Sequence, residues 1–223
     1  VQVKAIGVSA KPRPREESYM PAFLVGLGMA RSLGKLMGLP VHRFTHQHNH
    51  MFAGLWSVGK PAPDRFLLVH ISGGTTDLLL CERQPDGNFS LEPRGTSLDL
   101  HAGQFIDRVG VALGLPFPAG APLEKLAETA SEAHPLKVWS REGELSLSGP
   151  CTQTLRAIEK GEDPAALALG VEQAIGKALA RTISWVCEKE QLSQVLLAGG
   201  VSANREIRRQ LEDFLGQRQI GLW

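Results

Sequence analysis

The chain has 223 residues, of which 43% are hydrophobic, and a formal net charge of +1. This is enough chain for one large domain or two modest ones. No apolar run approaches the roughly 20 residues that cross a bilayer, which excludes a membrane-spanning helix. The three cysteines are far apart and form no CxxC pair. We therefore do not expect a disulfide scaffold, and we expect a cytoplasmic protein.

Charge is unevenly distributed along the chain. Residues 1–60 contain eight Lys and Arg against Glu16 and Glu17, which gives +6 there and leaves −5 for the rest. A basic segment of this kind can meet an anionic partner such as RNA, and a solvated surface helix and loop explains it equally well. Both ends of the sequence look like cuts through structured protein, so we expect a piece of something longer.

The first 60 residues predict a β-α-β unit, which favours a parallel sheet. The expected elements are a strand at 3–9, a charged loop broken by prolines at 11–18, a helix at 22–37 and a strand at 40–44. Ser18 is the candidate N-cap of the helix, with Pro21 in its first turn and Gly38 at its end.

The remaining chain again alternates strands and helices, so the predicted class is α/β. Strands are expected at 65–71, 77–81, 89–93 and 195–198, and helices at 103–113, 122–130, 164–191 and 204–214. The first two strands form a hairpin across residues 72–76. Residues 133–149 are expected to be irregular.

A histidine-rich segment at 42–50 is the most unusual stretch of the sequence. His46 and His50 are four residues apart, so on a helix they share one face and can hold one divalent metal ion. Imidazole nitrogen suits zinc or iron. The alternative is that the four-residue spacing of the two histidines arose by chance and binds no metal. Gln47 stands where a zinc-protease motif has Glu, and nothing else supports a peptidase.

Two glycine-rich turns are candidates for a nucleotide site. The first contains Ser72, Gly73, Gly74 and Thr75. Its consecutive amides and hydroxyls can form an anion nest, although a plain hairpin turn is the alternative. The second contains Gly199, Gly200 and Asn204. It lies between a buried strand and a helix, where a nucleotide can rest at the helix N-terminus. Neither turn has dinucleotide-fingerprint or Walker spacing.

Other polar side chains leave two interpretations each. Asp107 could bond a ribose hydroxyl or pair with Arg108 on the surface. Ser146 and Ser148 alternate along an expected extended piece, where one face could reach phosphate or form a polar edge strand. Cys151 has no base beside it in the sequence, so we expect a structural role.

Taken in order, these motifs resemble the universal tRNA threonylcarbamoyladenosine transferase family (TsaD, formerly described as O-sialoglycoprotein endopeptidase or glycoprotease) over nearly the whole chain. The most specific match is the run AGGVSANR at residues 198–205. Further matches are Ser72, Gly73, Gly74 and Thr76, His46 and His50, Gly95 to Asp99, Gly103, Asp107, Pro118, Gly120, Lys125, Ser148, Gly149 and Thr152.

The resemblance implies an actin, Hsp70 and sugar-kinase (ASKHA) fold, with two ribonuclease-H-like halves and nucleotide in their cleft. Residues 1–60 would be the C-terminal part of the first half. Residues 61–223 would be the second half, with a helical insert at about 96–150 and without its C-terminal end.

It also implies transfer of a threonylcarbamoyl group from threonylcarbamoyl-AMP to N6 of adenosine next to the tRNA anticodon. A divalent metal, iron or zinc, would bind His46 and His50 together with a late aspartate. ATP or threonylcarbamoyl-AMP would bind Ser72, Gly73, Gly74, Thr75, Asp107, Gly120, Gly199, Gly200 and Asn204. The implied partners are a smaller paralogue, an ATPase, and tRNA through the basic N-terminal segment, with no membrane.

Three positions and one segment depart from the family pattern. His48 replaces an acidic residue, Thr75 a histidine, Cys151 a lysine, and residues 11–19 a glycine-rich stretch. The alternative function is therefore an inactive or repurposed ATP-binding paralogue that acts as a scaffold. A sugar-kinase-like phosphotransfer lacks an aspartate in an obvious base position. We expect the 223-residue chain alone to be inactive.

Overall fold

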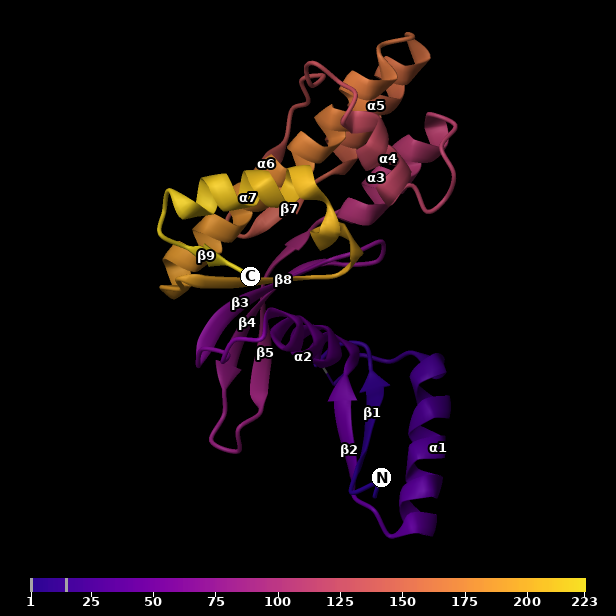
Figure 1. Cartoon of the computed structure of the whole chain (residues 1–223), viewed down its shortest axis with the longest axis vertical. Helices are drawn as coiled ribbons and strands as arrows, with labels where there is room; N and C mark the ends of the chain where they lie inside the picture. Colours follow the sequence, from indigo (N-terminus) through magenta and orange to yellow (C-terminus); the bar gives the residue numbers. More distant parts are fainter. Residues whose placement is uncertain (1, 15) are drawn as a thin grey trace. The chain divides into compact units, whose positions relative to one another are not determined.

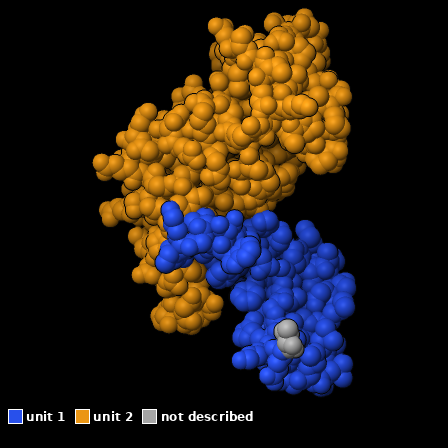
Figure 2. All heavy atoms as spheres, viewed as in Figure 1, with its two compact units in different colours: residues 1–62 blue, residues 63–223 orange. Residues whose placement is uncertain are grey.

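A computed structural model describes residues 2–14 and 16–223 of the chain. The chain divides into two compact units, Val1–Ala62 and Pro63–Trp223 (Figure 2). The assignment of these units to two ASKHA halves, and of residues 96–150 to a helical insert, stays a prediction. Arg15, one of the basic residues of the N-terminal segment, lies outside the described residues.

The first unit contains the predicted β-α-β arrangement (Figure 1). Its elements are β1 (Ile6–Lys11), α1 (Pro21–Met37), β2 (Val41–Thr45) and α2 (His46–Val58). The strands β1 and β2 are parallel, with Ile6 opposite Val41 and Lys11 opposite Thr45. This confirms the expected parallel pairing, although β1 starts three residues later than predicted.

The start of α1 differs from the prediction. Met20 occupies the N-cap position and Pro21 begins the helix, while Ser18 lies outside the cap. The Ser18 hydroxyl instead accepts a hydrogen bond of 2.9 Å from the backbone N–H of Arg13 and so braces the preceding loop. The end of the helix is as predicted, because Gly38 adopts a left-handed conformation with φ of 63°.

The second unit is built on a seven-stranded sheet in the order β6-β7-β5-β4-β3-β8-β9. Its strands are β3 (Arg65–Ile71), β4 (Thr76–Arg83), β5 (Phe89–Ser97), β6 (Trp139–Arg141), β7 (Glu144–Ser146), β8 (Gln194–Ala198) and β9 (Gly221–Leu222). Strands β3 and β4 form the predicted antiparallel hairpin, and β8 lies parallel to β3. The two glycine-rich turns therefore leave neighbouring strands at the same edge of the sheet.

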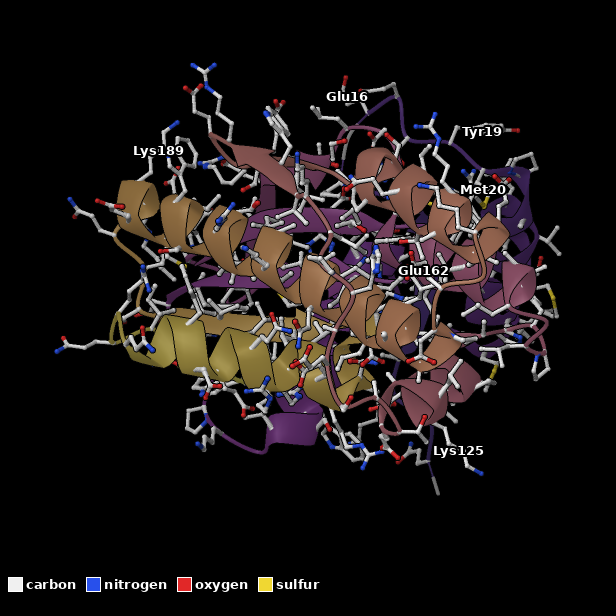
Figure 3. All side chains as sticks on the ribbon, turned by 90° about the horizontal axis from the view of Figure 1, so that it is seen from above. Glu16, Tyr19, Met20, Lys125, Glu162 and Lys189 are labelled. Carbon is white, nitrogen blue, oxygen red and sulfur yellow. The ribbon has the colours of Figure 1, made fainter. Side chains whose placement is uncertain are left out.

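Helices of the second unit pack against this sheet and against one another. They are α3 (Ala102–Ala112), α4 (Gly120–Ala127), α5 (Ser148–Glu159), α6 (Pro164–Glu190) and α7 (Arg205–Gly216). Figures 1 and 3 show α6 and α7 side by side over the sheet, with Lys189 near the end of α6. Alternate residues of β3, namely Leu67, Val69 and Ile71, are fully buried in the core shared with these helices.

Two segments were predicted wrongly. Residues 133–149, expected to be irregular, contain the short strands β6 and β7. Helix α5 was not expected, and Ser148 is its first residue, so Ser146 and Ser148 do not alternate along one strand. Helix α4 begins at Gly120, two residues before the predicted start.

Within residues 2–14 and 16–223, no helix combines the length and apolar character that crossing a membrane requires.

Candidate nucleotide site and histidine pair

The first glycine-rich turn is held in shape by its own backbone and by α3. The N–H of Ser72 donates to the carbonyl of Thr75 over 2.8 Å, which closes the turn. The N–H of Gly103 donates to the carbonyl of Ser72 over 3.1 Å. A Cβ at Gly103 would lie 2.6 Å from the nitrogen of Gly73. Only glycine therefore lets the start of α3 rest directly on the turn.

The second turn leaves β8 and leads into α7. Gly199 has φ of 98°, and a Cβ there would lie 2.2 Å from the carbonyl oxygen of Ile71. Residues Gly200–Ala203 then form one 3-10 turn. Asn204 is the N-cap of α7, and its Oδ1 accepts a hydrogen bond of 2.9 Å from the N–H of Ile207. The close approach at Gly199 brings the second turn against the end of β3.

Asp107 connects α3 to the start of α4. Its Oδ1 accepts a hydrogen bond of 2.8 Å from the N–H of Ala119, the residue before Gly120. Gly110 lies one turn further along α3, and a Cβ there would be 2.2 Å from Cβ of Ala119. Helix α3 and the start of α4 therefore pack closely, with the half-buried Asp107 carboxyl between them.

These pieces surround one cavity of about 390 Å³ within the second unit. Its lining residues are Gly73, Gly103, Ile106, Asp107, Pro118, Gly120, Ala121, Glu124, Gly200, Val201, Ala203 and Asn204. The volume and the mix of apolar walls with a few polar groups are typical of small-ligand sites.

Five of the nine residues predicted for nucleotide binding line this cavity: Gly73, Asp107, Gly120, Gly200 and Asn204. The other four, Ser72, Gly74, Thr75 and Gly199, lie in the same two turns but are not part of the lining. The structure thus brings together segments that are up to 131 residues apart in sequence, from Gly73 to Asn204. Their role as nucleotide ligands stays a prediction.

Glu124 lines the cavity and was not singled out from the sequence. It lies four residues after Gly120 on α4, so the two share one face of the helix, and this spacing was the available signal. Its Oε1 accepts hydrogen bonds from the N–H of Arg205 at 2.8 Å and from Nε of Arg205 at 3.2 Å. Arg205 also pairs with Glu128. These hydrogen bonds fix the carboxylate of Glu124 beside the N-terminus of α7.

Glu172 lies behind the cavity on α6 and is almost completely buried, with 1% of its surface exposed. Its pKa is raised to about 7: burial is the main cause, a hydrogen bond from Asn204 opposes the rise, and the negative charges of Glu124, Glu206 and Glu128 add to it. Glu172 was not predicted as a site residue, because it lies within an apolar helical run.

Asp99 organises the start of α5. Its Oδ2 accepts hydrogen bonds from the hydroxyls of Ser146, at 2.6 Å, and of Ser148. Its Oδ1 accepts from the N–H of Leu147 at 2.9 Å. Burial tends to raise the pKa of Asp99, but these hydrogen bonds outweigh it and lower the pKa to about 2. The two serine hydroxyls are therefore directed at Asp99 in this structure.

Cys151 follows on the same helix and is buried, with 2% of its surface exposed. Burial raises the pKa of its thiol, and the positive charge of Arg108 offsets part of this rise. A buried thiol with a raised pKa is a poor nucleophile.

The histidine pair occupies the first turn and a half of α2 in the first unit. Thr45 is the N-cap, and its hydroxyl accepts a hydrogen bond of 3.2 Å from the N–H of His48. Nε2 of His46 and Nε2 of His50 are 3.0 Å apart. Burial, and then the neighbouring His46, lower the pKa of His50, which favours the neutral imidazole that binds metals.

The two ring nitrogens lie close enough together to be ligands of one metal ion. Two nitrogens that each lie 2.0–2.1 Å from one tetrahedral ion are about 3.3 Å apart, and Nε2 of His46 and Nε2 of His50, at 3.0 Å, are also within hydrogen-bond distance of each other. His48 is held differently, because its Nδ1 lies 2.6 Å from the hydroxyl of Thr45. In the part of the chain that the structure describes, no three His, Cys, Asp or Glu side chains form a metal cluster. The assignment of His46 and His50 as metal ligands stays a prediction.

The chain is similar to known proteins over most of its length. The family profile described as "tRNA N6-adenosine threonylcarbamoyltransferase" (TsaD) matches residues 4–220. The chain is 36% identical over 202 residues to the protein of that name from Thermus thermophilus, covering 89% of this chain and 60% of the relative. It is 30% identical over 228 residues to the one from Bacillus subtilis, covering 97% and 62%. The chain thus spans about 60% of these relatives' length.

Solved structures show the same fold at low identity. HypF from T. kodakarensis superposes with a TM-score of 0.70 at 14% identity, over 96% of this chain and 37% of that one. Component A of the (R)-2-hydroxyglutaryl-CoA dehydratase from Acidaminococcus fermentans gives 0.51 at 17% identity, over 85% and 64%. The ASKHA-type α/β fold is therefore confirmed. From residue 4 to residue 220, this chain belongs to the tRNA N6-adenosine threonylcarbamoyltransferase family.

Proposed function

We propose that this chain supplies the nucleotide-binding and metal-binding parts of a transferase that moves a threonylcarbamoyl group from threonylcarbamoyl-AMP to N6 of adenosine in tRNA. One observation carries the proposal: Gly73, Asp107, Gly120, Gly200 and Asn204, chosen as nucleotide ligands from the sequence, line a single cavity. Membership of the family supports the reaction class.

The cavity suits the adenosine part of such a nucleotide. The glycine backbones at Gly73 and Gly200 have open space where a side chain would be, so a phosphate or ribose can approach their amides. Asp107 and Glu124 line the cavity, and their carboxyl groups are proposed to accept hydrogen bonds from ribose hydroxyls. Full-length HypF, which superposes with a TM-score of 0.69 at 14% identity over 41% of its chain, has been solved in a "phosphate- and nucleotide-bound form".

The histidine pair would hold a divalent ion, iron or zinc, through Nε2 of His46 and of His50. Such an ion, when bound, supplies positive charge that stabilises phosphate oxygens. In the overall reaction, the N6 amine of adenosine forms a bond to the carbamoyl carbon and releases one proton to solvent, the bond from that carbon to the phosphate oxygen breaks, and AMP leaves with the electron pair. This chain's residues bind and orient the nucleotide, and none is assigned as catalytic.

The partners follow from the family and from charge. A smaller paralogue and an ATPase are proposed as complex members in the cytoplasm. The basic first unit is proposed to contact tRNA, whose phosphates attract Lys and Arg side chains. Its charge comes from eight Lys and Arg in residues 1–60.

The second candidate function is a nucleotide-binding scaffold without transfer activity. The departures at His48, Thr75 and Cys151 favour it. Cys151, where the family pattern has a lysine, is a buried thiol whose pKa is raised by burial. In this second candidate function the cavity still binds a nucleotide. The chain then binds no metal ion and takes part in no transfer reaction.

Calorimetric titration of the 223-residue chain with AMP and ATP, and separately with Zn²⁺, tests the proposal. We expect nucleotide binding that is lost in Asp107→Ala and metal binding that is lost in His46→Ala. His42→Ala is the matched control for the metal, since His42 lies on β2 outside the pair. Nucleotide binding without metal binding favours the scaffold. Absence of nucleotide binding contradicts both candidates. The chain alone is expected to show no transfer.

A further inference from the structure

A buried carboxyl group lies directly behind the second glycine turn. Glu172 is in α6, a helix of 27 residues whose neighbouring positions are filled by core residues such as Val171 and Ile175. Only 1% of its surface is exposed. Burying a carboxyl group in such surroundings is costly unless it is hydrogen-bonded, so its partner is informative.

That partner is Asn204. Nδ2 of Asn204 donates a hydrogen bond of 2.6 Å to Oε1 of Glu172. Oδ1 of the same side chain accepts from the N–H of Ile207, as the N-cap of α7. The cap fixes which end of the amide faces α7, and its NH₂ end then requires an acceptor on the other side. Glu172 is that acceptor.

Asn204 also ends the turn that lines the cavity. Its backbone N–H donates to the carbonyl of Val201 over 3.1 Å, and the N–H of Ser202 donates to the carbonyl of Gly199 over 3.1 Å. Gly200, Val201, Ala203 and Asn204 all line the cavity. A side chain that sets the position of Asn204 therefore sets the wall of the cavity.

Charged groups surround Glu172 on both neighbouring helices. Glu124 of α4, Glu128 at the C-cap of α4 and Glu206 of α7 bring negative charge near it. Two arginines hold these groups: Arg205 pairs with Glu124 and Glu128, and Arg209 pairs with Glu206. The surface acids thus have basic partners, whereas Glu172 bonds to the neutral amide of Asn204.

We propose that Glu172 is a positioning residue of the nucleotide site, which holds the Asn204 amide and through it the turn from Gly199 to Asn204 in the shape that receives the ligand. The proposal rests on the proposed nucleotide function of the cavity. Glu172 does not line the cavity, so it acts on the ligand only through Asn204.

Hydrogen–deuterium exchange of the ligand-free 223-residue chain tests the positioning role, with AMP titration of the same variants in parallel. Glu172→Ala removes the acceptor, and we expect exchange of the amides in residues 200–204 to rise about tenfold, with an AMP affinity about tenfold weaker. Glu172→Gln keeps an oxygen acceptor and should restore both within about threefold.

Ile183→Ala is the matched control. Ile183 is a fully buried residue of the same helix, 11 positions and roughly 16 Å further along, so its loss weakens the core without touching Asn204. Unchanged exchange in Glu172→Ala would overturn the proposal, as would an equal rise in Ile183→Ala or a failure of Glu172→Gln to restore protection. If the exchange pattern holds but the wild-type chain binds no AMP, the nucleotide function fails and the control of the turn by Glu172 stands.

Discussion

Oδ2 of Asp99 accepts a hydrogen bond of 2.6 Å from the hydroxyl of Ser146, 47 residues further along the chain. The same carboxylate accepts from the N–H of Leu147 and of Ser148. One exposed side chain thus ties the end of β5 to the start of α5. A helix N-terminus leaves backbone N–H groups without intrahelical partners, and a carboxylate there stabilises it.

Replacing Asp99 should therefore weaken the second unit in a pH-dependent way. Its pKa is about 2 in the folded chain against 3.8 in the unfolded one, so its ionised form stabilises the fold above about pH 4. This stability is lost as the pH falls from about 4 towards 2. Asp99→Asn should unfold at lower urea concentration than wild type at pH 7, and the difference should vanish near pH 2. Glu132→Gln, at an exposed site, is the control. Equal midpoints of Asp99→Asn and wild type at pH 7 would refute this.

Glu172 should have the opposite effect on stability. Its pKa is about 7 when folded and 4.5 when unfolded, so the folded chain holds its proton more tightly. The free energy of unfolding then decreases as the pH rises from about 4.5 to 7, by at most about 3 kcal/mol, and stays low above. Glu172→Gln should remove this decrease and be the more stable protein at pH 8. Urea unfolding at pH 5 and pH 8 measures it, and parallel pH dependence in both proteins would contradict it.

Gly199 and Gly200 should respond differently to the same substitution. Gly199 has φ of 98°, and an added Cβ would lie 2.2 Å from a backbone oxygen. Gly199→Ala should therefore cost on the order of 2–3 kcal/mol in the free energy of unfolding. Gly200→Ala, where nothing lies within 4 Å of the added Cβ, should change it by less than about 0.5 kcal/mol. Thermal and urea unfolding give both values. A similar loss in the two variants would show that the turn is not packed as described.

Asp107 should separate the structural from the ligand-binding role of its carboxyl group. Asp107→Asn keeps an oxygen that can accept from the N–H of Ala119 but removes the negative charge. We expect an unfolding midpoint near that of wild type and an AMP affinity about tenfold weaker, because bonds to charged groups are the stronger ones. Asp213→Asn, on an exposed part of α7 outside the cavity, is the control. Unchanged affinity in Asp107→Asn would remove Asp107 from the site.

The elements predicted well from the sequence are those with a strong local pattern. Strand β3 is a continuous apolar run, and α6 carries an apolar face over 27 residues that begins at Pro164. Helix α5 was missed because Gly149 and Pro150 stand in its first turn, and the carboxylate that supports this turn, Asp99, lies about 50 residues earlier. The sequence around Gly149 does not indicate that a residue so far away in the chain, Asp99, bonds to this turn.

The residues of the candidate site divide in the same way, into those with a local sequence signal and those that depend on a distant partner. Both glycine turns were visible in the sequence, since glycine pairs after buried strands are local signals. Glu172 was not, because its position inside an apolar helix gives no hint that Asn204 lies 2.6 Å away. Ser18 was predicted as a cap from its spacing, but the backbone of Arg13 competes for its hydroxyl.

Photoaffinity labelling with an azido-adenine nucleotide tests the central claim most directly, namely that the cavity between the two glycine turns, α3 and α4 binds an adenine nucleotide. After digestion, we expect the adduct in peptides that contain residues 103–124 or 199–205, the segments that line the cavity, and we expect excess AMP to suppress it. Labelling confined to other segments, or labelling that excess AMP does not reduce, would contradict the claim.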